Sequence, residues 1–293
     1  MTRFSSPSPL VPFREMAAYE ALWAEKKTTF KSLANLLASN LGSKPSDLVS
    51  EHKITSFINI LNEMALCPSH LPELKVLING MRDYPKGLQD AKDPVELFYY
   101  IGKLELFYTR RIAIIGTRKP SEESLQITHD IVTNLVNENF TIVSGLASGI
   151  DTQAHKSAIA AEGRTIAVLG TPLNKVYPPA NSHLQREIAN NHLLISQVPF
   201  YRYTQQGCLY NKLFFPERNK TMSALTEATL IIEASDTSGT LTQATAALYQ
   251  KRKLLIWDTC FNNEKWTWPS RLLEKEAIKV RNIEEIKTAL IID

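Results

Sequence analysis

The sequence predicts an α/β fold: an extended Rossmann-like, doubly wound and mostly parallel sheet, preceded by a small helical N-terminal module. Three observations carry this prediction. Short apolar, β-branched runs alternate with helical periodicity over most of the chain, two of these runs end in small-residue turns that lead into helices, and the first part shows helical periodicity alone.

The helical module is predicted from Pro12 to about Leu77, where apolar residues recur at spacings of three and four. Residues 42–46 break the pattern, and Ser46 is expected to cap the next helix. Basic and acidic residues nearly balance in this part, which disfavours an indiscriminate basic DNA-binding arm. We therefore expect a helical module over residues 1–81 and a Rossmann domain over residues 82–293.

The Rossmann domain is predicted from its alternating elements. Six apolar runs indicate buried strands at residues 112–115, 141–143, 165–169, 193–195, 230–232 and 253–257. Helical stretches separate most of them, at residues 124–137, 151–161, 182–190 and 240–250. The tail is expected to form two short helices around a strand at residues 278–280.

Composition excludes several classes of protein. In 293 residues no apolar run reaches the length of a membrane span, and the N-terminus shows no signal-peptide stretch. The three cysteines are far apart and lack metal-binding spacing, which indicates structural thiols in a cytoplasmic protein and no metal site. No cofactor is expected. A net charge of +3 neither requires nor excludes nucleic acid.

The first predicted strand ends in a turn made of Gly116, Thr117 and Arg118. Backbone N–H groups at the start of a helix, with a guanidinium beside them, form a site suited to phosphate. The alternative is an ordinary turn with a surface arginine.

The second strand ends in a longer small-residue turn. Gly145 and Gly149 would let the backbone turn sharply and approach a ligand. Ser144 stands where a dinucleotide enzyme would carry its ribose-binding carboxylate, which disfavours NAD. Asp151 is expected to cap the following helix, with His155 supporting the turn from the same helix face.

Two further segments complete the candidate site. Residues 214–220 are expected to form a basic-aromatic loop that contains Phe215, Arg218, Asn219 and Lys220, within a stretch of local net charge +3 from residue 201 to 220. Aromatic faces and cations suit single-stranded nucleic acid, whereas the alternative is a loop with core aromatics and solvated charges. A third anion-compatible turn, made of Ser238, Gly239 and Thr240, opens a helix at the same sheet edge.

Taken in order, these motifs resemble the DprA/Smf (DNA processing protein A) family over about residues 82–292. Further blocks that carry the resemblance are Tyr84-Pro85, Asp93-Pro94, Ala154-His155, Tyr177-Pro178 and Glu233-Ala234. The resemblance implies a non-catalytic homodimer that holds single-stranded DNA in a basic pocket. It also implies a role in DNA uptake (transformation) and DNA recombination, by loading a RecA-type recombinase.

The resemblance also implies roles for individual residues. Three cations would contact phosphates: Arg118, Arg218 and Lys220. The backbone around the bound phosphates would come from Gly116, Ser144, Gly145 and Gly149. Phe215 and Asn219 would contact bases. The pocket would be closed by Ser238, Gly239 and Thr240. Thr117 stands where the family usually has serine, and Lys220 where it usually has a second arginine.

Two other functions remain open at this point. A nucleotide hydrolase of the related LOG type would need a glutamate in the turn at residues 237–243, where this chain has no carboxylate. A nucleotide-sensing protein would use the same anion-compatible turns. The context could also be a mobile element or a defence system.

Overall fold

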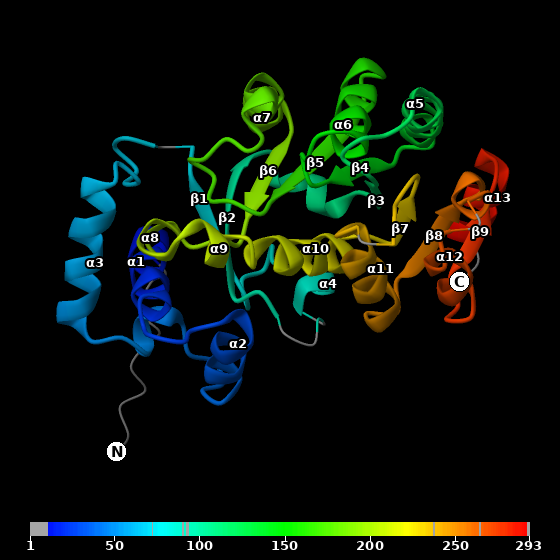
Figure 1. Ribbon diagram of the computed structural model, residues 1–293. Coiled ribbons are helices and arrows are strands. Elements are labelled where there is room, and N and C mark those ends of the chain that lie inside the picture. Colours follow the sequence, from blue (N-terminus) through cyan, green and yellow to red (C-terminus); the bar gives the residue numbers. More distant parts are fainter. Residues whose placement is uncertain are drawn as a thin grey trace.

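The computed structural model describes residues 11–71, 73–89, 91, 94–236, 238–263 and 265–291. Within these residues nine strands form one sheet in the order β1-β2-β6-β5-β4-β3-β7-β8-β9 (Figure 1). The strands are β1 Lys75–Ile78, β2 Leu97–Gly102, β3 Arg111–Ile115, β4 Thr141–Ser144, β5 Arg164–Leu169, β6 Leu193–Ser196, β7 Ala228–Ile231, β8 Lys253–Trp257 and β9 Ile278–Val280. Every neighbouring pair from β6 to β9 is parallel, whereas β2 is antiparallel to both β1 and β6. The predicted doubly wound, mostly parallel sheet is confirmed.

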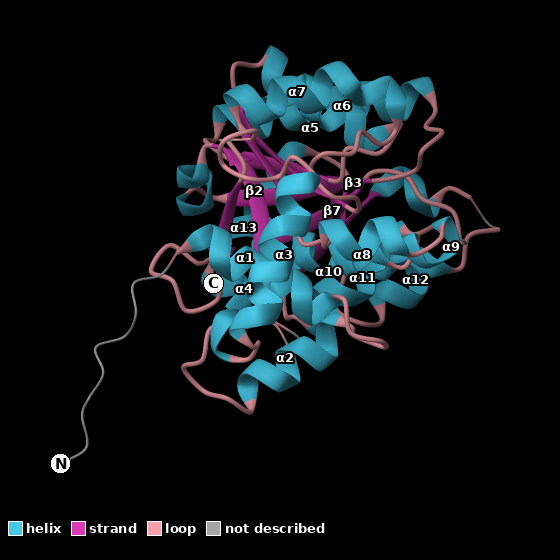
Figure 2. Ribbon diagram, turned by 90° about the vertical axis from the view of Figure 1, so that its left-hand side faces the viewer, coloured by secondary structure: helices cyan, strands magenta, loops and turns pink. Residues whose placement is uncertain are grey.

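Helices cover both faces of the sheet (Figure 2). One face carries α5 Glu122–Asn137, α6 Ile150–Ala160, α7 Ser182–Asn191 and α13 Ile283–Ile291, and the other carries α4 Lys86–Gln89, α10 Phe214–Leu225, α11 Thr240–Tyr249 and α12 Trp268–Leu273. Successive strand residues face opposite layers, so Ile142 packs with α5 and α6 while Val143 packs with α10 and α11. Both faces are therefore buried, which explains the unbroken apolar runs in the sequence.

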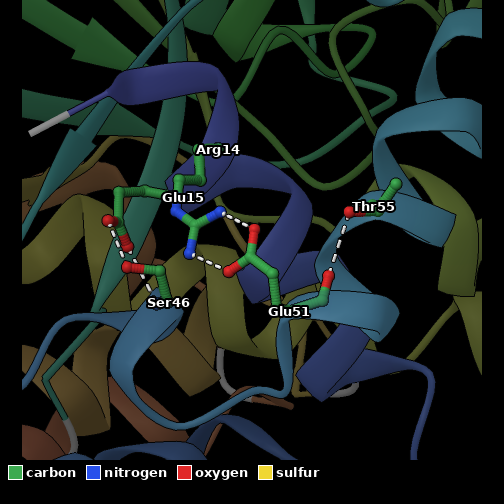
Figure 3. Close-up of polar contacts among 5 residues, drawn as sticks. All are labelled: Arg14, Glu15, Ser46, Glu51 and Thr55. Carbon is green, nitrogen blue, oxygen red and sulfur yellow. Dashed lines mark hydrogen bonds and ion pairs between the residues drawn. The ribbon is translucent and has the colours of Figure 1, made fainter.

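The N-terminal segment is helical as predicted, with α1 Pro12–Trp23, α2 Phe30–Ala38 and α3 Glu51–Glu63. Ser46 does not cap α3, because it lies inside a short 3₁₀ turn. Its backbone N and Oγ donate instead to the buried carboxylate of Glu15, at 2.9 and 2.6 Å (Figure 3). Beside it, Arg14 makes a two-bonded ion pair with Glu51 at 2.5 and 2.6 Å (Figure 3). These contacts hold α1 against the 3₁₀ turn and α3.

The end of the predicted helical stretch is wrong, because Lys75–Ile78 forms the edge strand β1 and pairs with β2. The apolar run Val76–Ile78 has three residues, too few for periodicity to separate strand from helix. The division at residue 81 stays a prediction. The structure shows α1 in one hydrophobic cluster with β1 and β2, through Trp23, Val76 and Leu97.

Residues 214–220 are not the loop that the sequence indicated, but the first two turns of α10. Pro216 lies in the first turn of this helix, where its missing N–H group removes no helical hydrogen bond. Two short helices precede it, α8 Phe200–Gln205 and α9 Cys208–Asn211. The predicted tail of two helices around a strand is confirmed by α12, β9 and α13. In the described residues no helix is both long and apolar enough to cross a membrane.

A buried carboxylate joins the N-terminal helices to the rest of the chain. Glu20 of α1 has no exposed surface, and its Oε1 accepts from Tyr99 Oη at 2.5 Å and from the backbone N of Phe200 at 2.8 Å. Its Oε2 accepts from the backbone N of Tyr201 at 2.9 Å, in the first turn of α8. Burial raises the pKa of Glu20 to about 7, although these donors act against the rise.

This raised pKa predicts a pH-dependent stability. The folded state retains a proton on Glu20 that the unfolded state releases near its ordinary pKa of 4.5, so stability should fall as pH rises from about 4.5 to about 7. The size of the fall should be on the order of 3 kcal/mol. Urea unfolding at several pH values should show a flatter profile for Glu20→Gln than for wild type. Glu63→Gln, at an exposed position of α3, is the control. Parallel profiles for Glu20→Gln and wild type would refute the assignment.

Candidate nucleic-acid interface

A cleft of about 510 Å³ lies at the carboxyl edge of the sheet, where the strand order reverses on either side of β3. Its walls come from the turn after β3, the loop between β4 and α6, the segment after β7, and helices α10 and α11. In open α/β sheets this switch point is where ligands bind. Of the residues predicted for the site, the cleft is lined by Gly116, Thr117, Arg118, Phe215, Arg218, Asn219, Ser238, Gly239 and Thr240.

Four predicted residues do not line this cleft. Ser144 is fully buried, and its Oγ donates to the backbone O of Ile114 at 2.7 Å. Gly145 and Gly149 are not among the residues that line the cleft, and Lys220 lies on the opposite side of α10. Lys220 forms an ion pair with Glu217 at 2.7 Å. A phosphate contact by Lys220 inside this cleft therefore does not fit the geometry.

Gly149 brings two of the predicted turns into contact. Its φ of +80° is a conformation that favours glycine, and a Cβ there would lie 2.4 Å from the backbone O of Thr117. The next residue, Ile150, donates its N–H to the same oxygen at 3.2 Å. The turns after β3 and β4 therefore lie against each other, as the parallel sheet required.

The free positive charge of the cleft comes from Arg118 and Lys119. Both side chains are exposed, and neither has a hydrogen-bond or ion-pair partner among the described residues. The backbone N of Lys119 donates to Thr117 Oγ1 at 3.2 Å, which orders the turn. Lys119 was not among the predicted residues, although its position directly after Arg118 was a usable signal.

Arg218 is buried in the wall of the cleft and holds the loop after β4. Its Nη1 donates to the backbone O of Gly145 at 2.6 Å and of Val168 at 2.8 Å. A Cβ on Gly145 would lie 2.0 Å from Nη1, so the close approach requires glycine. Nη2 has no partner within the described part of the chain, and a phosphate contact by this atom stays a prediction.

Asp151 is the carboxylate that balances Arg218. Its Oδ2 accepts from the backbone N of Gly145 at 3.1 Å and of Ala147 at 3.4 Å. It therefore does not cap α6, whose first turn has Gly149 at the N-cap position. Burial raises the pKa of Asp151 and lowers that of Arg218, and the attraction between the two charges opposes both shifts.

His155 supports the sheet behind the loop and lies away from the cleft. It is fully buried, with Nδ1 2.6 Å from Thr165 Oγ1. Burial lowers its pKa to about 3, so the ring is neutral at ordinary pH.

Phe215 lines the cleft, and a second aromatic ring, that of Tyr177, packs against it from outside the lining. Phe215 lies on Gly170, where a Cβ would be 2.6 Å from its ring, and its centroid is 5.5 Å from that of Tyr177. Tyr177 is 44% exposed. The neighbouring Asn219 uses its amide internally, because Nδ2 donates to Gly239 O at 3.1 Å and Oδ1 accepts from Arg218 Nε at 2.9 Å. Base contacts by Phe215 and Asn219 stay predictions.

The start of α11 lines the cleft and contacts the turn after β3. Thr240 donates its backbone N to Ser238 Oγ at 3.2 Å and its Oγ1 to Gly116 O at 3.3 Å. Gln243 lines the cleft at 1% exposure. Thr237, in the same turn, lies outside the described residues. Groups of three or more possible metal ligands are absent from the described part of the chain.

Fold and site define a class: a doubly wound α/β protein with an anion-compatible cleft at its switch point. The chain belongs to the family of DNA recombination-mediator protein A, whose family model matches residues 75–290. The resemblance drawn from the sequence is thereby confirmed.

Similar proteins have been named and solved in several bacteria. The chain is 31% identical to the DNA processing protein DprA of Bacillus subtilis over 206 residues, which cover 70% of this chain and 67% of that protein. It is 40% identical to the protein Smf of Synechocystis over 166 residues, which cover 55% of this chain and 40% of that protein. The match therefore spans less than half of the Synechocystis protein.

Two solved structures share the fold. The crystal structure of DNA processing protein A from Streptococcus pneumoniae matches with a TM-score of 0.69 and 25% identity, covering 94% of this chain and 92% of that one. The protein from Helicobacter pylori, described for its single-stranded DNA binding mode, matches with a TM-score of 0.62 and 30% identity. That match covers 75% of this chain and 96% of the other.

The contact between Gly145 and Arg218 predicts a loss of stability on Gly145→Ala. The new methyl group would displace a guanidinium held by two carbonyls, which should lower the free energy of unfolding by about 1–3 kcal/mol in urea titrations. Gly239→Ala, where a Cβ meets nothing within 4 Å, is the matched control and should change it by less than about 0.5 kcal/mol. In an Arg218→Met background the loss at Gly145 should shrink. Equal losses in both backgrounds would contradict the contact.

Proposed function

We propose that this chain is a single-stranded DNA-binding protein of the DNA-processing type, which holds the strand in the cleft at the switch point and does not cleave it. The observation that carries the proposal is that two exposed cations, Arg118 and Lys119, and the aromatic ring of Phe215 line the same cleft. Cations that neutralise phosphates and rings that stack on bases are the two parts of a single-strand site. Family membership and the single-stranded DNA binding described for the Helicobacter pylori protein support it.

The chemistry of the cleft favours binding over turnover. Asp151 is the carboxylate among its described lining residues, and two backbone N–H groups and the charge of Arg218 engage it. Gln243 lines the start of α11, where a hydrolase of the LOG type would need an acid. A general acid must reach the bond that breaks with a proton to give, and neither side chain is placed for that role.

The wider role is part of the same proposal and is supported by family membership. The family's description as a recombination mediator supports a RecA-type recombinase as a partner, with the chain acting as a homodimer in the cytoplasm during DNA uptake and recombination. The spacing of the cysteines, which lacks a metal-binding pattern, agrees with that compartment.

A small nucleotide is the second candidate ligand. A cleft of about 510 Å³ lies within the range of small-molecule sites, roughly 300–1,000 Å³. Tight binding of a mononucleotide without binding of oligonucleotides would favour this function over the first.

Removal of the Arg118 guanidinium should weaken the binding of single-stranded DNA without unfolding the chain. Because this side chain has no partner among the described residues, Arg118→Ala should leave the unfolding midpoint unchanged. A lost phosphate contact should flatten the dependence of log affinity on log salt by about 0.7. Fluorescence anisotropy with labelled oligothymidine between low and moderate salt measures the affinity and its salt slope.

The control is Lys156→Ala, which removes an exposed positive charge on α6 outside the cleft lining. It should leave both affinity and salt slope unchanged. Absence of salt-dependent binding in wild type, or an Arg118→Ala protein that binds like wild type, would overturn the proposed function.

A further inference from the structure

A second hollow, of about 540 Å³, lies on the other side of α10, and residues of α2, α9 and α10 line it. Its floor is a cluster of three buried aromatic rings, with Trp23 4.7 Å from Phe30 and 6.2 Å from Phe214 between centroids. We call this hollow the α2–α10 groove. It joins the N-terminal helices to the Rossmann part of the chain.

The rim of the groove is basic. Its described lining contains four cations, Lys27, Lys31, Arg202 and Lys220, against the single carboxylate of Glu217. The ion pair between Lys220 and Glu217 neutralises those two charges. Three positive charges therefore remain uncompensated at the rim.

These remaining cations differ in how they are held. Arg202 is fixed, because Nε donates to Gln206 Oε1 at 2.9 Å and Nη1 donates to Glu25 O at 3.3 Å. Lys27 and Lys31 are exposed and have no partner among the residues that the structure describes. One anchored guanidinium beside two free ammonium groups is suited to a flexible polyanion.

An exposed aromatic ring completes the groove. Tyr210 of α9 lines it at 65% exposure, beside Leu213 at 64%. An exposed ring next to cations offers a stacking face for a base, as in other single-strand sites.

The groove continues the cleft around the start of α10. Pro216 lines both hollows. The cleft side of the helix carries Phe215, Arg218 and Asn219, and the groove side carries Phe214, Glu217 and Lys220. A strand that leaves the cleft over the first turn of α10 therefore enters the groove directly.

We propose that the α2–α10 groove is the second segment of the single-stranded DNA path, in which Lys27, Lys31 and Arg202 neutralise phosphates and Tyr210 stacks on a base. This inference rests on the proposed function of the cleft. It gives the N-terminal helices a direct part in binding, which their balanced overall charge concealed. Continuity with the cleft favours a nucleic-acid strand over an acidic peptide as the occupant.

Oligonucleotides of two lengths test the groove separately from the cleft. Roughly 4 nucleotides should occupy the cleft alone, and roughly 16 should reach the groove. For the long oligothymidine, the double variant Lys27→Ala/Lys31→Ala should flatten the salt slope by about 1.4, because two phosphate contacts are lost. For the short one, affinity and slope should match wild type.

Two further variants sharpen the test. Lys26→Ala removes an equivalent exposed charge from the same turn, outside the groove lining, and should bind both lengths like wild type. Tyr210→Leu should weaken binding of the long oligothymidine roughly tenfold, and Tyr210→Phe should restore it, because the ring and not the hydroxyl stacks.

The outcomes separate the two proposals. If Arg118→Ala weakens both lengths while the double lysine variant binds the long one like wild type, the cleft stands and the groove inference is overturned. Equal effects of the double variant on the short and the long oligothymidine would also overturn the groove inference, since the two lysines would then act through long-range electrostatic attraction and not through contacts in the groove. If wild type binds neither length, the proposed function fails as well.

Discussion

The site depends on one buried cation, Arg218, at the carboxyl ends of two parallel strands. Nη1 donates to the backbone oxygens of Gly145, directly after β4, and of Val168, the second-last residue of β5. Removal of a guanidinium from water is unfavourable unless such bonds and a counter-charge compensate for it, which the carbonyls and Asp151 do. Because Arg218 belongs to α10, the same bonds fix this helix across the edge of the sheet. The cleft and the α2–α10 groove are the two sides of that helix.

Glu20 has a comparable role between α1 and the segment that follows β6. It is a buried carboxyl group that accepts from the first N–H groups of α8, as Arg218 is a buried cation that donates to carbonyls near the ends of two strands. Each side chain bonds backbone groups at or near the ends of regular elements. The N-terminal helices are thereby held to the segment that leads into α9 and α10. The walls of the groove come from parts of the chain far apart in sequence, yet polar contacts of this kind tie them together.

The sheet could be predicted from the sequence because each of its central strands is a local apolar run buried on both faces. The turns after β3 and β4 could be predicted for the same reason, since small residues at strand ends are a local signal. The helix α10 could not, because its first turn carries two aromatics and a proline, and its stability comes from packing against distant strands. The burial of Arg218 could not be predicted either, since its partners lie 73 and 50 residues away.

The exclusion of Lys220 from the cleft follows from that helix. In a loop, Arg218 and Lys220 could face the same ligand, but in α10 two positions correspond to about half a turn, so their side chains face opposite sides. The positive charges therefore divide into two kinds: Arg218 maintains the shape of the cleft, whereas Arg118 and Lys119 are exposed, without partners among the described residues, and available to a ligand. A cation that the protein already pairs neutralises a phosphate poorly and so releases few of the counterions that surround the DNA. The dependence of affinity on salt must therefore come from the unpaired cations. Total positive charge in a sequence motif is thus a poor measure of binding, because it counts buried and ion-paired cations together with exposed ones.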